Sequence, residues 1–358
     1  MSAVSSSLPA PDPFIAELEQ AMSSMPLQND LYRPSSFWAQ AAEDIAEQVR
    51  RHGVENFRRL PLPLGYFVPT YGMPGNGFDD RTGEALEAAV AGEAKPMLTV
   101  EQLLSGHSSA LADFRVLQAA DGISSAKPCL QSFSESAVGN PVEQFTFEGR
   151  RFSRSSLNYL LGLCLLKRRL GTDEIGTVVE IGGGFGSLGE ILLSGGDPRM
   201  KYVDLDIPPN STIARHYLSA VLGPERVAGF AQTADRGRID IAELPAASAL
   251  CNWQIEHLHG EVDLFVNFIS FQEMEPPIVR NYLTHVERLG ARWVLLRNMR
   301  EGKQRRTTHS VGVIEPIVSE DYLHMLPGYE LIERNVSPFG YRTVDGYHSE
   351  LLLLRRHR

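Results

Sequence analysis

Residues 177–193, TVVEIGGGFGSLGEILL, decide the fold. The β-branched residues at 177–181 predict a buried strand, and the spaced apolar residues from 188 onward predict a helix. Three alternate glycines lie between the two, namely Gly182, Gly184 and Gly186. Glycine lets a ligand approach the backbone closely, and the first turn of the following helix offers free N–H groups. A strand, a glycine-rich turn and a helix in this order predict a cofactor site in an α/β protein.

Two classes of cofactor fit this turn. Residues 184–189, GFGSLG, match the G-x-G-x-x-G pattern of dinucleotide-binding folds, with Asp206 about twenty residues further on. In that pattern the strand runs almost directly into the first glycine, whereas here Glu180 ends the strand and two extra glycines follow. An acid before G-x-G-x-G is typical of methyltransferases, in which it faces the cationic amino-acid end of S-adenosylmethionine. The turn favours such a methyltransferase. An NAD(P)-dependent oxidoreductase and a catalytically silent binding protein of the same fold remain as alternatives.

A second strand is predicted over 201–206, KYVDLD, and it ends in Asp206. A carboxylate at this position can accept hydrogen bonds from both ribose hydroxyls of an adenosyl group. Asp204 is the rival residue, but side chains alternate along a strand, and Asp206 lies nearer the carboxyl end, where ligands bind. We therefore expect Asp206 to bind the cofactor together with Glu180 and the three alternate glycines.

The rest of the C-terminal part alternates short β-rich runs with helical segments. The runs are Val178–Ile181, Lys201–Asp206, Arg226–Phe230, Val262–Phe268 and Trp293–Arg297. Alternation of this kind predicts a parallel sheet with helices on both faces. Two further runs, 328–336 and 347–356, are joined by a turn-rich stretch and predict an antiparallel pair. The expected fold class is α/β, a doubly wound, seven-stranded, mostly parallel methyltransferase sheet with an antiparallel C-terminal strand.

A mainly helical segment, 1–150, is expected to shape the substrate pocket in front of a methyltransferase domain at 151–358. Residues 1–13 contain almost no large apolar groups, and we expect them to be disordered. Helices are predicted within 37–52, ended by Gly53, and over 99–122 and 153–170. Residues 60–78 are rich in Pro, Gly and aromatic residues, and they predict an ordered lid without regular structure.

Composition and charge exclude several partners. With 43% hydrophobic and 22% charged residues the chain can bury a full core, and its net charge of −10 gives no general attraction for nucleic acid. The best apolar run, Leu157–Leu166, is half the length of a membrane span and no signal peptide is visible, so we expect a cytoplasmic protein without a membrane partner. The three cysteines lack metal-binding spacing, and no metal is expected. A small-molecule substrate is the expected partner, and a homo-oligomer is compatible with the sequence.

Three motifs, VVEIGGGFGSLGEILL, YVDLDIPP and VDLFVNFISFQEM, resemble those of a bacterial family of sugar O-methyltransferases. The resemblance covers residues 150–300 well and the N-terminal region loosely. The family features are a tripled glycine, a D-[IL]-P after the second strand and an Asn…Ser-x-x-Glu-Met run after the fourth, found here at Gly182–Gly184, Asp206–Pro208, Asn267, Ser270, Glu273 and Met274. The resemblance implies methyl transfer from S-adenosylmethionine to a hydroxyl of a sugar or sugar-containing small molecule, in natural-product or glycan biosynthesis.

Methyl transfer to a hydroxyl requires in-line placement of donor and acceptor and a base that removes a proton. Ligands in this fold lie beyond the carboxyl ends of the strands, which selects the loops after Phe268 and Arg297. Glu273 in the first loop and His309 in the second, with an ordinary pKa of about 6.5, are the predicted bases. Arg154 and Asn267 are expected to bind the cofactor, and Tyr66, Tyr71, Gln272 and Asn298 to bind the substrate. The basic run 303–306 predicts a solvated loop.

Overall fold

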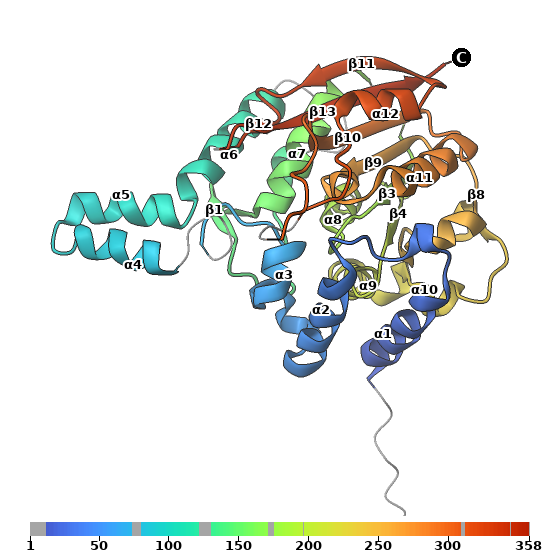
Figure 1. Ribbon diagram of the computed structural model, residues 1–358, viewed down its shortest axis with the longest axis horizontal. Helices are drawn as coiled ribbons and strands as arrows, with labels where there is room; N and C mark the ends of the chain where they lie inside the picture. Colours follow the sequence, from blue (N-terminus) through green and yellow to red (C-terminus); the bar gives the residue numbers. More distant parts are fainter. Residues whose placement is uncertain are drawn as a thin grey trace, which may run out of the picture.

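A mixed sheet forms the centre of the protein (Figure 1). The computed structural model describes residues 12–73, 80–121, 130–170, 175–195, 197–308, 312–343 and 345–357. Over these ranges the sheet has nine strands, in the order β11 (Tyr329–Asn335), β13 (His348–Arg356), β10 (Trp293–Met299), β9 (Leu264–Phe268), β3 (Thr177–Ile181), β4 (Lys201–Asp206), β7 (Ala247–Cys251) and β5 (Val227–Ala228), with β12 (Tyr341–Arg342) beside β13. Each of the seven predicted runs contains a strand, although β5 has only two residues, and β7 and β12 were not predicted.

The C-terminal strand β13 is inserted between β10 and β11 and runs antiparallel to both. The pairs from β10 through to β5 are all parallel. Each central strand is buried along its length, which suits a parallel sheet covered by helices on both faces. The predicted doubly wound sheet with an antiparallel C-terminal strand is confirmed.

The direction of winding reverses at β3. The chain passes from β3 to β4 and β7 on one side, then returns to β9 and β10 on the other. Right-handed crossovers therefore place α8 (Ser187–Ser194) and α9 (Asn210–Leu222) on one face and α11 (Pro276–Arg288) on the opposite face. The carboxyl ends of β3 and β9 diverge at this switch point, which is where open α/β sheets form their ligand crevice.

One strand differs from the sequence-based expectation. The run Arg226–Phe230 contributes only the two-residue edge strand β5, and β7 occupies the position beside β4 instead. The sequence of β7, ASALC, lacks the β-branched and aromatic residues that mark a strand, and all five of its side chains are buried. Small residues suit this strand because helices pack closely over it, so a β-propensity signal was absent.

Helices dominate the part of the chain before β3. They are α1 (Pro13–Ser24), α2 (Ala39–His52), α3 (Pro61–Tyr66), α4 (Asp80–Ala89), α5 (Ala94–Leu104), α6 (His107–Asp121) and α7 (Arg154–Lys167), with a hairpin of β1 (Phe145–Phe147) and β2 (Arg150–Phe152) before α7. The C-terminal part also contains the short helices α10 (Phe230–Thr233) and α12 (Ser319–Met325) and the strand pair β6 (Ile239–Asp240) and β8 (Leu258–His259). In Figure 1, α4 and α5 project as a helical hairpin from one side of the molecule.

Several helix predictions are confirmed and others are corrected. α2 ends at Gly53, with φ of +83°, and Ser153 caps the start of α7. The helix expected over 99–122 is instead two helices, because Gly106 adopts φ of +76° between α5 and α6. The lid expected to lack regular structure contains α3. Of the stretch expected to be disordered, residues 1–11 lie outside the described residues, whereas the side chain of Asp12 caps α1.

The segment before α7 packs on the sheet domain through a shared core. One cluster of buried apolar residues extends from Phe14 in α1 to Leu354 in β13. A buried ion-pair network adds to it, in which the Arg58 guanidinium contacts the Glu135 carboxylate at 2.7 Å and the Glu143 carboxylate at 2.6 Å. The expected boundary at residue 150 falls inside the β1–β2 hairpin. Among the described helices, none combines the length and apolar character needed to cross a membrane.

Candidate active site

A cavity lies beyond the carboxyl ends of β3, β4, β7 and β9, at the switch point of the sheet. The space within it and its open mouth together is about 1030 Å³. The sheet contributes Gly182, Gly183, Gly184, Asp206, Ile207, Asn252, Ile269, Ser270 and Glu273; α7 contributes Ser155, Asn158 and Tyr159; the front segment contributes Ser35, Trp38, Tyr66 and Phe67. The cavity is therefore formed jointly by the sheet domain and the front segment.

The glycine-rich turn forms one wall of the cavity. Gly182 and Gly184 have φ of +72° and +65°, a region that other residues rarely adopt. A Cβ atom at Gly182 would overlap the side chain of Ser270, whereas at Gly184 its nearest neighbour would be the Phe67 carbonyl at 3.4 Å. The third alternate glycine, Gly186, is the N-cap of α8 and does not line the cavity. Two of the three glycines thus present backbone to a ligand.

Asp206 reaches the cavity and Asp204 does not. The Asp206 carboxylate accepts the N–H of Gly184 at 3.0 Å and the N–H of Ile207 at 2.7 Å. Asp204 is fully buried behind the turn, where its Oδ1 accepts the N–H of Gly183 at 3.0 Å. Burial raises the pKa of Asp206 to about 7, and the hydrogen bonds from the turn oppose that rise. The carboxylates of β4 thus hold the glycine-rich turn in place.

Glu180 lies directly behind the cavity wall. Its side chain is fully buried and is not among the residues lining the cavity. Its Oε1 accepts the hydroxyl of Tyr159 at 2.7 Å, and its Oε2 accepts the hydroxyl of Tyr202 at 2.6 Å. Burial raises the pKa of Glu180 to about 7, although both phenol hydrogen bonds lower it. Of the two tyrosines only Tyr159 lines the cavity.

Two buried asparagines present oxygen atoms that have no partner. Asn252 follows β7, and its Nδ2 donates to the Tyr32 carbonyl at 2.8 Å and to the Tyr282 hydroxyl at 2.7 Å. Its Oδ1 accepts no hydrogen bond, and the same is true of Oδ1 of Asn210 at the start of α9. Both residues line the cavity. Sequence reasoning missed both residues, because Asn210 lies four residues beyond β4 and the strand before Asn252, β7, was not predicted.

Glu273 lies where the front segment meets the sheet domain. Its carboxylate accepts Nε1 of Trp38 at 3.1 Å and pairs with Nζ of Lys303 at 2.6 Å. Its backbone carbonyl accepts the hydroxyl of Ser35 at 2.8 Å. Lys303 also lies 3.9 Å from the centroid of the Phe37 ring. The expectation of a solvated loop is therefore wrong for Lys303, because its ammonium group is held by a carboxylate and a ring.

Ile269 adds backbone strain at the same point. Its φ is +75°, which is unusual for a β-branched residue, and it lines the cavity directly after β9. Its N–H donates to the Arg297 carbonyl at 2.6 Å. Strained conformations of this kind persist where surrounding contacts enforce them, and they are common at functional sites.

Several predicted residues support the site from outside the cavity. Asn267 donates to the Ile181 carbonyl at 2.8 Å and to the Ser270 hydroxyl at 2.6 Å, so it joins β3 to the loop after β9. Asn298 accepts the N–H of Gln272 at 3.1 Å, and Gln272 accepts the N–H of Met299 at 2.7 Å. These side chains hold the loops that follow β9 and β10, and they do not line the cavity.

The remaining predicted residues are dispersed. Tyr66 lines the cavity, but the Tyr71 hydroxyl donates to Asp113 at 2.5 Å and lies outside it. Arg154 donates to the Thr70 carbonyl and to the Tyr341 hydroxyl, both at 2.7 Å, and it does not line the cavity. His309 lies outside the described residues. Within the described ranges no group of three or more His, Cys, Asp or Glu side chains is arranged to hold a metal ion.

No protein-family model and no curated protein sequence matches the chain. Among solved structures the chain is similar to magnesium protoporphyrin IX methyltransferase from Synechocystis PCC 6803 with bound SAM, at 14% identity and a TM-score of 0.38, covering 57% of this chain and 79% of that chain. It is also similar to the mitomycin 7-O-methyltransferase, at 13% identity and a TM-score of 0.35, covering 94% and 76%. A third is a SAM-dependent methyltransferase from Aquifex aeolicus, at 13% and 0.35, covering 57% and 94%. Because these identities and TM-scores are low, the function is inferred from the strand order and from the contacts in the cavity.

Proposed function

We propose that the protein transfers a methyl group from S-adenosylmethionine to a hydroxyl group of a sugar or sugar-containing small molecule. The observation that carries the proposal is the combination of an antiparallel strand inserted between β10 and β11 with a glycine-rich turn backed by three carboxylates. A dinucleotide would place its pyrophosphate at such a turn, and its negative charge would oppose ionisation of the carboxyl groups of Glu180, Asp204 and Asp206. The same carboxylates favour a cationic ligand.

The residues of the cavity fit the donor along its length. Asp206 offers a carboxylate to the two ribose hydroxyls, and Asn210 and Asn252 add polar side chains to the cavity wall. Gly182 and Gly184 allow the donor to approach the backbone of the turn. When bound, S-adenosylmethionine supplies a methyl group on a sulfonium centre. The chain's own task is to hold that group in line with the acceptor and to exclude water.

The acceptor is expected to lie between the glycine-rich turn and the front segment. Trp38, Tyr66 and Phe67 supply aromatic surface there, and Glu273 supplies a carboxylate. Aromatic faces pack on the apolar faces of sugar rings, and a carboxylate accepts hydrogen bonds from sugar hydroxyls. The resemblance to sugar O-methyltransferases in residues 150–300 supports the same acceptor class. Both supports depend on the front segment being closed over the cavity, as it is in this structure.

Two residues are proposed as the base that takes the hydroxyl proton, Glu273 and His309. Glu273 lines the cavity, and its carboxylate lies 2.6 Å from Nζ of Lys303. We expect Glu273→Gln or His309→Asn to retain donor binding and to lower turnover, because only the base acts in the chemical step. Full activity in either variant removes that residue from this role.

The function is tested by isothermal titration of the purified protein with S-adenosylhomocysteine, with NAD(H) and NADP(H) in parallel. We expect micromolar binding of S-adenosylhomocysteine alone. Binding of a nicotinamide cofactor alone, or of none of these ligands, contradicts the proposal. Incubation with S-adenosylmethionine and a panel of glycosides, followed by mass spectrometry for an added methyl group, then tests the acceptor class. Methylation confined to acceptors without a sugar would contradict that part.

A further inference from the structure

We propose that the Tyr159 hydroxyl binds the α-ammonium group of the methyl donor. Glu180 does not contact this group, and its negative charge acts through the hydrogen bond that joins it to Tyr159. The inference rests on the proposed function, since it assigns the residue that recognises the cationic end of that donor. Sequence reasoning placed Glu180 itself against the ammonium group. The structure places a phenol between the carboxylate and the cavity.

Glu180 has no direct access to a ligand. Its side chain is fully buried, and each of its oxygens already accepts a phenol hydroxyl, from Tyr159 at 2.7 Å and from Tyr202 at 2.6 Å. An ammonium group in the cavity would meet the phenol oxygen of Tyr159 first. Direct contact with Glu180 would require the Tyr159 ring to move away.

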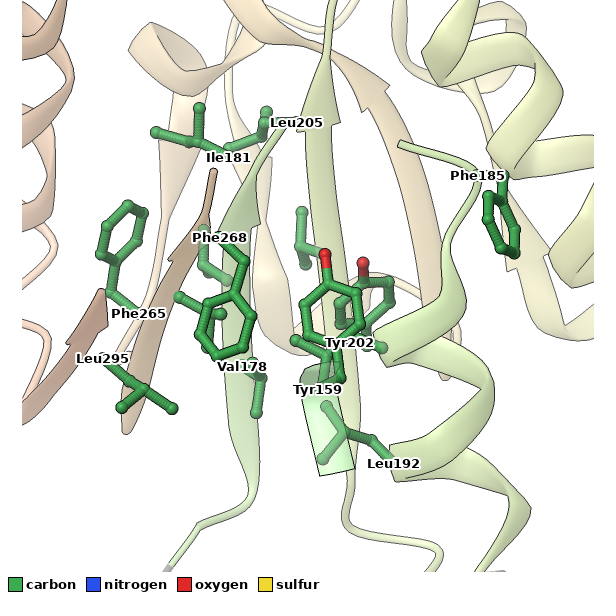
Figure 2. Close-up of a cluster of buried hydrophobic side chains, with 14 of the residues drawn as sticks. Tyr159, Val178, Ile181, Phe185, Leu192, Tyr202, Leu205, Phe265, Phe268 and Leu295 are labelled. Carbon is green, nitrogen blue, oxygen red and sulfur yellow. The ribbon is translucent and has the colours of Figure 1, made fainter. Parts of the chain in front are cut away.

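The Tyr159 ring is held in place by its neighbours. It stacks on the Phe268 ring with centroids 4.9 Å apart and planes 14° from parallel, and Figure 2 shows the two rings side by side beside β3. Phe268 ends β9, and its ring packs closely against α7, since a Cβ atom at Gly162 in that helix would overlap the ring. A rotation of Tyr159 would therefore disrupt a packed layer, which makes direct contact between Glu180 and the ligand unfavourable.

The hydroxyl of Tyr159 is suited to a cation. A phenol has one proton to donate and two lone pairs to accept with, and Tyr159 donates its proton to Glu180. The lone pairs remain for a donor in the cavity. Hydrogen bonds in series polarise one another, and the low dielectric of a buried site strengthens the effect. The negative charge of Glu180 thus increases the attraction between the Tyr159 oxygen and an ammonium group.

The charges around the turn favour a cation over a neutral ligand. The hydrogen bonds that Glu180, Asp204 and Asp206 accept come from phenols, backbone N–H groups and an asparagine, all of them neutral donors. Burial raises the pKa of each carboxyl group. A ligand that brings a positive charge beside the turn would stabilise the ionised forms.

Tyr202 provides a matched control. Its hydroxyl donates to the other oxygen of Glu180 at nearly the same distance, but Tyr202 does not line the cavity. Its ring packs beneath α8, where a Cβ atom at Gly189 would lie 2.6 Å from it. Both tyrosines support Glu180, and only Tyr159 can also contact a ligand. A purely structural role for the phenols predicts equal effects of the two Tyr→Phe substitutions on ligand selectivity.

The test compares two ligands that differ only in the ammonium group, S-adenosylhomocysteine and 4-(5′-adenosylthio)butanoate. Affinities are measured by isothermal titration for the wild type, Tyr159→Phe, Tyr202→Phe and Glu180→Gln. We expect Tyr159→Phe and Glu180→Gln to lower the affinity for S-adenosylhomocysteine about tenfold or more. The affinity for the ammonium-free analogue should fall less than about threefold. Tyr202→Phe should leave the ratio of the two affinities within about threefold of the wild type.

Different failures have different meanings. The inference is overturned if Tyr159→Phe lowers the affinities for both ligands equally, or if Tyr202→Phe loses as much selectivity as Tyr159→Phe. Either result leaves the proposed function intact. Loss of selectivity in Glu180→Gln alone also overturns it, because Glu180 would then act without Tyr159. Failure of the wild type to bind S-adenosylhomocysteine overturns the proposed function itself. Thermal unfolding of each variant shows whether it folds, and Tyr159→Phe keeps the ring that stacks on Phe268.

Discussion

Asp204 and Asp206 lie two residues apart on β4, yet only Asp206 lines the cavity. The difference arises at the end of the strand, where the chain turns into α9 and exposes Asp206 to the crevice. Asp204 is covered by Gly183, and its Oδ1 accepts that residue's N–H. Glu180 is covered in the same way by Tyr159. A carboxylate at this edge of the sheet can therefore contact a ligand directly, hold the turn, or act through another side chain.

The first prediction concerns Asp206→Asn. Loss of the charge weakens the hydrogen bonds to the ribose hydroxyls, and we expect a tenfold to hundredfold lower affinity for S-adenosylhomocysteine, or about 1–3 kcal/mol. The measurement is isothermal titration. Asp204→Asn is the matched control, because an amide oxygen still accepts the Gly183 N–H, and its affinity should change less than about threefold. A larger effect of Asp204→Asn than of Asp206→Asn would exchange their roles.

The second prediction concerns pH. Burial raises the pKa of Glu180 from 4.5 to about 7, so the free protein loses stability from this group as pH rises from 4.5 towards 7. A cationic ligand binds the ionised carboxylate more tightly. We therefore expect the affinity for S-adenosylhomocysteine to rise between about pH 6 and pH 8. Titration across this range measures the effect, and Glu180→Gln should flatten part of it. A wild-type affinity independent of pH would contradict the raised pKa.

Between elements, buried charge pairs hold distant parts of the front segment together, and a hydrogen bond joins that segment to α8. Arg58 belongs to the 3-10 helix Val54–Arg59, and its partners Glu135 and Glu143 lie in the chain before α7. Glu190 in α8 accepts the N–H of Ser136 at 2.8 Å, and burial raises its pKa to about 7. The buried carboxylates of Glu135 and Glu143 thus depend on one guanidinium group, that of Arg58, as their positive partner.

The third prediction concerns Arg58→Met. This change leaves Glu135 and Glu143 buried without their positive partner, and we expect the free energy of unfolding to fall by about 3–5 kcal/mol. Urea denaturation monitored by circular dichroism measures it. The control is Arg51→Met, which removes an exposed pair with Glu47 and should cost less than about 1 kcal/mol. Equal losses in the two variants would show that the buried network contributes no more than a surface pair.

Across the whole molecule, the cavity is closed by segments that are far apart in the sequence. Ser35 and Trp38 from the front segment bind Glu273, and Lys303 from the loop after β10 binds the same carboxylate. Glu275 makes a second junction, since it accepts the N–H groups of Ile314 and Glu315, both at 3.0 Å. The loop after β9 therefore joins the front segment to the loop after β10.

The fourth prediction concerns Glu275→Ala. Without this carboxylate the N–H groups of Ile314 and Glu315 lose their acceptor, and we expect faster amide hydrogen exchange in residues 312–318. Mass spectrometry of exchanged peptides measures the change. Glu330→Ala, which removes an exposed pair with Arg355, should leave that exchange unchanged. Unaltered exchange in Glu275→Ala would show that other contacts hold the loop.

The sequence by itself determined the α/β class, the antiparallel C-terminal strand and the placement of Gly182, Gly184 and Asp206 at the cavity. These features follow from local patterns, because β-branched runs, alternate glycines and a strand-terminal acid act within a few residues. β7 escaped detection because its burial depends on helices from elsewhere in the chain and not on its own propensity.

Only the tertiary structure decided what each polar side chain contacts. It placed Tyr159 between Glu180 and the cavity, brought Lys303 onto Glu273, and left Tyr71 and Arg154 bonded outside the site. It also showed the unpartnered oxygen of Asn252. The physical reason is that hydrogen bonds and burial join residues distant in sequence. Local patterns specify where a strand ends, whereas packing determines which side chain faces the ligand.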